Sequence, residues 1–139
     1  MASLSKSLRP TLIAGLICAL SAPLSAQSLA DSAWVPVEIA GEAVEAGEDV
    51  LIRFAPDGSV SGNGGCNNFS GSFVTNGDAI LVGPIAATMM LCEDPYSAME
   101  MQIFRGLEIA RAYAIEGPEL ELSDGTGASV MTLIKRAAE

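Results

Sequence analysis

The sequence predicts an α+β domain in which a mainly antiparallel curled sheet, or partial barrel, packs on one principal helix. Three observations lead to this prediction. Most of the chain after residue 30 consists of short stretches in which apolar and polar residues alternate, which is the period of a β-strand. Sequences rich in Gly, Asn, Asp and Pro separate these stretches, so neighbouring strands are expected to pair locally and antiparallel. One segment, from about residue 95 to 110, changes to helical spacing.

The expected strands follow one another with a turn after most of them. The first covers residues 32–39, and Pro36 is expected to place it at an edge of the sheet because proline cannot donate a ladder hydrogen bond. Residues 56–58 and 76–78 are strong turn sequences, in which proline or glycine supplies the required backbone angles. The other expected strands cover residues 50–54, 59–62, 68–75, 79–82, 85–89, 112–116, 119–122 and 130–134.

The helix is predicted to begin at Asp94-Pro95, with Asp94 as N-cap and Pro95 in the first helical position. Apolar residues then recur at steps of three and four, which predicts an amphipathic helix of about four turns. Its apolar face is expected to carry Tyr96, Met99, Ile103, Leu107 and Ala110. Its solvated face is expected to carry Ser97, Glu100, Arg105 and Glu108.

Residues 1–30 are predicted to be a signal peptide, which leaves residues 31–139 as a single domain. The chain starts with basic residues, continues with an apolar run at 11–20 that is too short to span a bilayer, and then becomes rich in small residues. Cleavage is expected after Ala26 or after Ala30. A membrane anchor that stays attached is the alternative.

A periplasmic or secreted location without a stable membrane anchor follows from this leader. Cys18 is a candidate for lipid attachment, but bulky Ile17 stands where a lipoprotein signal has a small residue. Removal of residues 1–30 leaves five basic residues against all 17 acidic ones, a net charge of −12. Such a surface repels phosphate backbones and anionic lipid headgroups, so nucleic acid is excluded as a partner.

Two cysteines remain in the mature chain, Cys66 and Cys92, with 25 residues between them. An oxidising destination favours a structural disulfide. Closing this loop would contribute roughly 3 to 4 kcal/mol on the chain-entropy model. Free thiols are one alternative. A redox pair is another, because Cys92 lies just before a helix N-terminus.

No arrangement of residues predicts catalysis, a metal site or a cofactor. The chain has no histidine, so Gly58-Ser59-Val60-Ser61-Gly62 lacks the base that a serine hydrolase needs. Gly62, Gly64 and Gly65 do not form a phosphate loop, because a strand rather than a helix follows them. The acidic residues at 42–49 fit no calcium-binding spacing.

The order of the short motifs resembles the META domain family, which includes the heat-inducible, HslJ-like outer-membrane lipoproteins of Gram-negative bacteria. The resemblance covers about residues 32–136 and depends mainly on two blocks, Gly65-Cys66-Asn67 and Thr88-Met89-Met90-Leu91-Cys92. The family motif positions carried over are Gly65, Cys66, Asn67, Thr88, Met89 and Cys92. The second block departs from the family pattern in its cysteine spacing, so Met89 and Met90 can exchange roles.

The resemblance implies a compact α+β domain of the cell envelope, linked to stress and antibiotic tolerance, with no established reaction or cofactor. We therefore expect a non-enzymatic exported protein that binds another protein or a small apolar ligand. A module that docks on a secretion-system partner is an alternative, and a carboxylate-dependent hydrolase is the weakest one. An open apolar cavity would favour a small ligand, whereas a filled core would favour surface recognition.

Overall fold

The computed structural model describes residues 15, 19 and 27–137, so most of the predicted signal peptide lies outside the described residues. The strands are β1 (Ser32–Ile39), β2 (Glu42–Ala43), β3 (Leu51–Phe54), β4 (Ser59–Asn63), β5 (Asn68–Asn76), β6 (Ala79–Val82), β7 (Ala86–Ala87), β8 (Ala112–Glu116), β9 (Glu119–Ser123) and β10 (Ser129–Lys135). The helix α1 spans Tyr96–Ile109. Among the described residues, no helix has both the length and the hydropathy needed to cross a membrane.

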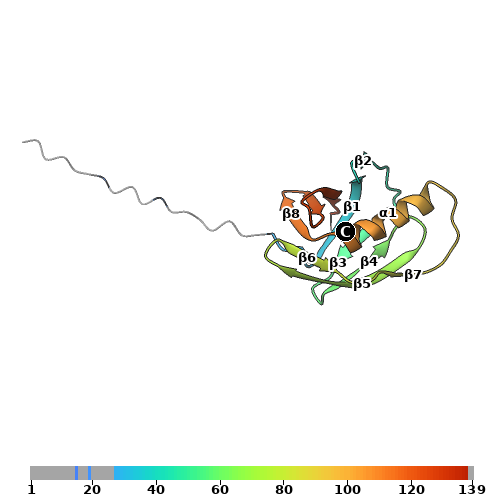
Figure 1. Cartoon of the computed structure of the whole chain (residues 1–139), viewed down its shortest axis with the longest axis horizontal. Coiled ribbons are helices and arrows are strands. Elements are labelled where there is room, and N and C mark those ends of the chain that lie inside the picture. Colours follow the sequence, from blue (N-terminus) through green and yellow to red (C-terminus); the bar gives the residue numbers. More distant parts are fainter. Residues whose placement is uncertain (1–14, 16–18, 20–26, 138–139) are drawn as a thin grey trace, which may run out of the picture.

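All strand pairs are antiparallel, and the sheet curls until its two ends meet. The strands pair in the order β10-β9-β8-β6-β5-β4-β3-β1-β2, and β1 also pairs with β10. The shortest strand pairing in this ring is between β6 and β8, where Ala79 pairs with Ala112. Figure 1 shows α1 lying across the inside of this curved sheet. The predicted fold class, a curled antiparallel sheet packed on one helix, is confirmed.

The prediction that residues 32–39 form an edge strand is wrong. β1 pairs with β3 on one side and with β10 on the other, so it lies inside the sheet. Pro36 is accommodated because the β3 pairing ends at Trp34 and the β10 register shifts between Pro36 and Glu38. A bulge is one of the few places in a sheet where a missing N–H costs little.

The core fills the space between α1 and the inner face of the sheet. The predicted alternation is confirmed in the central strands, where Ile52, Phe54, Leu120 and Leu122 are fully buried. Phe54 and Phe73 pack edge to face, with ring centroids 5.0 Å apart, an arrangement that adds about 0.5 to 1.5 kcal/mol to their burial. The buried apolar side chains form one continuous cluster, so the ring encloses packed side chains.

Three details at and before the start of α1 differ from the prediction. The N-cap is Pro95 without a side-chain cap bond, whereas the Asp94 carboxyl accepts a hydrogen bond from the Ser97 hydroxyl at 2.5 Å. Tyr96, expected on the apolar face, is the first residue of α1 and is 49% exposed. The strand predicted at residues 85–89 is reduced to the two residues of β7.

Candidate functional site: the junction between two loops and the helix

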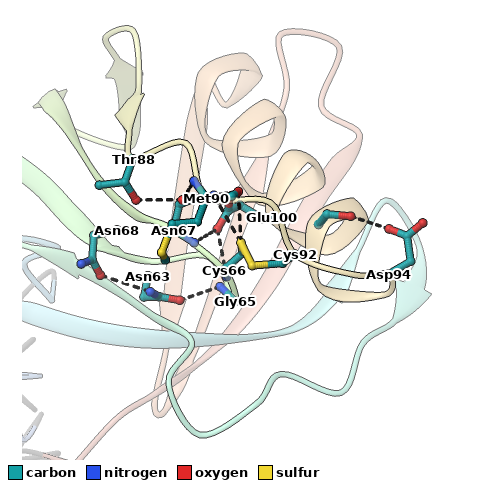
Figure 2. Close-up of a disulfide and its surroundings, with 11 residues drawn as sticks. Asn63, Gly65, Cys66, Asn67, Asn68, Thr88, Met90, Cys92, Asp94 and Glu100 are labelled. Carbon is teal, nitrogen blue, oxygen red and sulfur yellow. Dashed lines mark hydrogen bonds between the residues drawn. A yellow bond between two sulfur atoms is a disulfide. The ribbon is translucent and has the colours of Figure 1, made fainter.

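The two cysteine-containing blocks meet beside the first turns of α1. Cys66 and Cys92 form a disulfide with their Cα atoms 6.0 Å apart, so the predicted pairing is present. We call the surrounding group the junction; it comprises Gly64, Gly65, Cys66, Asn67, Thr88, Met90, Cys92 and Glu100. Figure 2 labels all of these residues except Gly64. It joins the loop between β4 and β5 to the segment between β7 and α1 and to the helix itself.

Asn67 is the residue that holds the two loops together through hydrogen bonds. Its side-chain oxygen accepts from the Thr88 hydroxyl at 2.8 Å and from the backbone N–H of Met90 at 2.7 Å. Its amide nitrogen donates to the Met90 carbonyl at 3.2 Å and to Glu100 Oε1 at 2.7 Å. Asn67 is only 6% exposed, so the side chain uses its acceptor and its donors inside the protein.

Glu100 was predicted to lie on the solvated face of the helix, and this prediction is wrong. Its side chain is 6% exposed and points into the junction (Figure 2). Its Oε2 atom accepts from the backbone N–H groups of Cys66, at 3.1 Å, and Asn67, at 2.5 Å. Both N–H groups belong to the tight bend between β4 and β5, where no neighbouring strand supplies an acceptor. The carboxyl therefore replaces a strand partner for this bend.

Two glycines make room for this arrangement. A Cβ on Gly64 would lie 2.7 Å from Glu100 Cγ, and a Cβ on Gly65 would lie 2.9 Å from Met99 Cε. Gly65 also has a φ of 115°, which side-chain-bearing residues rarely adopt. The glycines that precede Cys66 thus let the bend approach the helix closely enough for Glu100 to reach its backbone.

The polar side chains of the junction are hydrogen-bonded within the protein. Both oxygens of Glu100 accept hydrogen bonds from groups that cannot be substrates. Among residues 27–137, no buried side-chain nitrogen or oxygen lacks a hydrogen-bond partner. No cluster of three or more metal-binding side chains occurs in the part of the chain that the structure describes.

The sequence between Thr88 and Cys92 carries three exposed apolar side chains. Met89 is 94% exposed, Met90 is 60% exposed, and Leu91 is fully exposed. We call these three residues the methionine loop. The loop is fixed at one end by the bonds of Asn67 to Thr88 and Met90 and at the other by the disulfide at Cys92. Rigid display of adjacent apolar side chains in water is typical of an interaction surface.

Two acidic residues follow the methionine loop and the disulfide. Glu93 and Asp94 follow the disulfide in sequence and are exposed. A separate hollow of about 340 Å³ is lined by Glu48, Asp49 and Tyr96, together with Gly47, Val50 and Gly65. The apolar loop is therefore followed in the chain, after Cys92, by two exposed carboxylates.

Two further hollows lie away from the junction. One, of about 590 Å³, lies on the outer face of α1 and is lined by Ala98, Met101, Gln102, Phe104, Arg105 and Glu108. The other, of about 650 Å³, is lined by both acidic and basic side chains, including Asp31, Glu48, Arg53, Lys135 and Arg136. The Arg136 guanidinium donates to the Glu48 carbonyl at 3.3 Å across this hollow.

Comparison with known proteins places the whole described domain in one family. A family model of the META domain matches residues 27–137. The chain belongs to the META domain family. This confirms the resemblance read from the two cysteine blocks, and the HslJ-like proteins belong to the same family. A comparison with curated proteins gives no match.

Solved structures share the fold of this META domain. An NMR structure of a protein from Burkholderia xenovorans is similar with a TM-score of 0.64 and 19% identity, covering 79% of this chain and 85% of that one. A crystal structure of a DUF4847 family protein from Bacteroides vulgatus is similar with a TM-score of 0.60 and 13% identity, covering 80% and 96%. At these identities the likeness concerns the fold alone.

The structure brings most of the predicted motif residues together. Cys66, Asn67, Thr88 and Cys92 meet in the junction, and Gly65 lies against the helix. Met89 instead points into solvent, while its neighbour Met90 makes the backbone contacts with Asn67. Glu100 was missed as a site residue. Its spacing of three residues from Ile103 and seven from Leu107 places it on the buried stripe, and this was the signal available in the sequence.

Proposed function

We propose that this META domain is a non-enzymatic envelope module that binds a protein partner through the methionine loop. The observation that carries the proposal is the exposure of three consecutive apolar side chains on a segment fixed at both ends. A loop held in one conformation loses little conformational entropy on binding. Methionine side chains adapt to different apolar surfaces, which suits them to recognition.

The partner surface is a segment with apolar residues flanked by basic ones. Glu93 and Asp94 follow the loop in the chain, after Cys92, and are exposed, and residues 31–139 have a net charge of −12. Complementary charge speeds encounter and selects against acidic partners. An apolar, cationic segment of an envelope or secretion-system protein meets both requirements.

The family and the disulfide both fit an envelope protein, and we propose a periplasmic or secreted location with a role in stress or antibiotic tolerance. A catalytic role is not proposed, because the one buried carboxyl of the site is committed to backbone N–H groups. The filled core directs recognition to the surface.

The proposal is tested with two synthetic peptides of equal length, one of alternating leucine and lysine and one of alternating leucine and glutamate. Each is added to the purified, disulfide-bonded protein while the methionine methyl signals are followed by NMR. We expect the lysine peptide to shift Met89 and Met90, to leave buried Met131 unchanged, and to bind more weakly at high salt. Equal binding of the glutamate peptide, or no shift at Met89 and Met90, would contradict the proposal.

A matched pair of variants locates the binding surface. Leu91→Ser removes an exposed apolar side chain from the loop, and Leu81→Ser removes one from β6, where Leu81 is 52% exposed. We expect Leu91→Ser to abolish the peptide-induced shifts and Leu81→Ser to leave them. In cells, a photo-crosslinking residue at position 91, but not at position 81, should capture the natural partner.

A small apolar ligand is the second candidate, favoured by the hollow on the outer face of α1. Met101, which is 72% exposed, and Phe104 line it. A hydrophobic fluorescent dye that binds there would lose its signal in Met101→Ser but not in Leu91→Ser. The reverse pattern would assign apolar binding to the methionine loop.

A further inference from the structure

The sulfur atoms of the domain differ sharply in their exposure. Both cysteines of the described chain are joined in the disulfide, so the reduced sulfur atoms that residues 27–137 offer are thioethers. Met89, Met90 and Met101 are 94%, 60% and 72% exposed, whereas Met99 and Met131 are 8% and 1% exposed. An oxidant arriving from solvent therefore meets the methionine loop before it meets the core methionines.

The reaction needs no group other than the thioether and a two-electron oxidant such as hydrogen peroxide or hypochlorous acid. With peroxide, a sulfur lone pair attacks one oxygen, the O–O bond breaks, and the sulfur gains that oxygen as a sulfoxide. A proton moves to the departing oxygen, which leaves as water. The sulfur is oxidised by two electrons and the peroxide is reduced by two, and the apolar side chain becomes polar.

We propose that Met89 and Met90 are oxidant-sensitive residues whose conversion to sulfoxides switches off binding at the methionine loop. The inference rests on the proposed function of that loop. Their positions suit a switch, because Met90 is held through its backbone N–H and carbonyl by Asn67. Oxidation of the exposed side chains therefore changes the polarity of the surface while the junction and the disulfide keep the fold.

The modification is tested by treating the folded protein with dilute hydrogen peroxide and mapping each methionine by mass spectrometry. We expect Met89, Met90 and Met101 to gain one oxygen at least about tenfold faster than Met99 and Met131. The unfolded protein in denaturant serves as control, and there all five should react alike. Equal rates in the folded protein would overturn the inference.

The switch is tested with the leucine–lysine peptide, using variants that keep the apolar surface but cannot be oxidised. The double variant M89L/M90L, compared with its own untreated sample, should show the same peptide affinity after peroxide, whereas the wild type and M101L should lose binding relative to their untreated samples. Continued binding by the oxidised wild type would overturn the switch. If the untreated protein does not bind the peptide, the proposed function fails, while mass spectrometry still decides the modification.

Discussion

Acidic side chains accept hydrogen bonds both in two hairpin turns and in the junction. The two regions differ in how far along the chain the hydrogen-bond donors lie from the carboxyl. In the turns between β3 and β4 and between β9 and β10, Asp57 and Asp124 accept hydrogen bonds from residues two positions on, Ser59 and Thr126. Glu100 accepts from Cys66 and Asn67, 34 and 33 positions away. The turn carboxyls each close a local hairpin, and Glu100 ties together segments that only the tertiary fold brings close.

The largest expected effect comes from removing the buried carboxyl. Glu100→Ala leaves the backbone N–H groups of Cys66 and Asn67, and one N–H of the Asn67 side-chain amide, without an acceptor. Unsatisfied buried donors cost about 1 to 3 kcal/mol each, so the free energy of unfolding should fall by about 3 to 5 kcal/mol. Urea unfolding measures this change. Gln102→Ala is the matched control, since Gln102 is exposed on the same helix and its replacement should cost less than about 1 kcal/mol.

A double-mutant cycle separates the hydrogen bonds from general packing. In Glu100→Gln, the new side-chain amide nitrogen takes the place of Glu100 Oε1. It then faces the side-chain nitrogen of Asn67, so two hydrogen-bond donors oppose each other. Adding Asn67→Asp supplies an acceptor at that contact, and the double variant should therefore be more stable than Asn67→Asp alone. A double variant no more stable than Asn67→Asp alone would show that the Glu100–Asn67 bond contributes nothing to the junction.

The next effect concerns the covalent part of the junction. Replacing Cys66 and Cys92 together by alanine should lower the free energy of unfolding by about 3 to 4 kcal/mol, because the unfolded chain gains the freedom of the opened loop. The hydrogen bonds of Asn67 should persist, so the Met90 amide should stay protected from hydrogen exchange in the folded variant. Loss of that protection would mean that the disulfide alone positions the loop.

The same contrast explains what the sequence predicts and what it does not. Three predicted features that depend on neighbours in the chain are confirmed: the alternation in β3 and β9, the turn at Pro56-Asp57-Gly58, and the presence of a helix after Asp94-Pro95. The position of β1 inside the sheet depends on its pairing with β10, about 100 residues away. Pro36 alone predicts an edge strand, because the sequence near it does not show this pairing. The role of Glu100 depends on a bend that the helix meets only after folding.

At the N-terminus of the domain, the cleavage sites predicted from the sequence can be compared with the contacts that the fold makes. The leader pattern permits cleavage after Ala26 or Ala30, but Leu29 is 1% exposed and belongs to the core cluster. The Ser32 hydroxyl donates to the Leu29 carbonyl, and the Trp34 indole N–H donates to the Ser32 oxygen at 2.6 Å. The mature chain should therefore begin at Gln27, which intact-mass measurement of exported protein can check.

Loss of Leu29 should have a measurable energetic effect. A chain that begins at Asp31, or the variant Leu29→Ala in the longer chain, should be less stable by about 2 to 4 kcal/mol, the usual range for deleting a buried leucine side chain. Ser28→Ala, on an exposed neighbour, is the control. Equal unfolding midpoints for chains that begin at Gln27 and Asp31 would remove the structural argument for the earlier cleavage.

The smallest expected effect lies in the two local turns and appears only in acid. Hydrogen bonds from the Ser59 hydroxyl and backbone N–H hold the pKa of Asp57 below its ordinary value, and those from the Thr126 hydroxyl and N–H do the same for the pKa of Asp124. The stability that they contribute is fully present above the unfolded-state pKa of about 4. It is lost as the pH falls through the lowered pKa of the folded state.

The double variant D57N/D124N tests this acid limb, because asparagine still accepts the turn hydrogen bonds but does not titrate. Its unfolding midpoint should change less between pH 5 and pH 2, values chosen as about one unit above and two below the ordinary aspartate pKa. Asp78→Asn, in the hairpin turn before β6, controls for the loss of a negative charge. An acid limb as steep in the double variant as in the wild type would assign the acid sensitivity to other carboxyls. The local turns would then add rigidity to the hairpins without adding pH dependence.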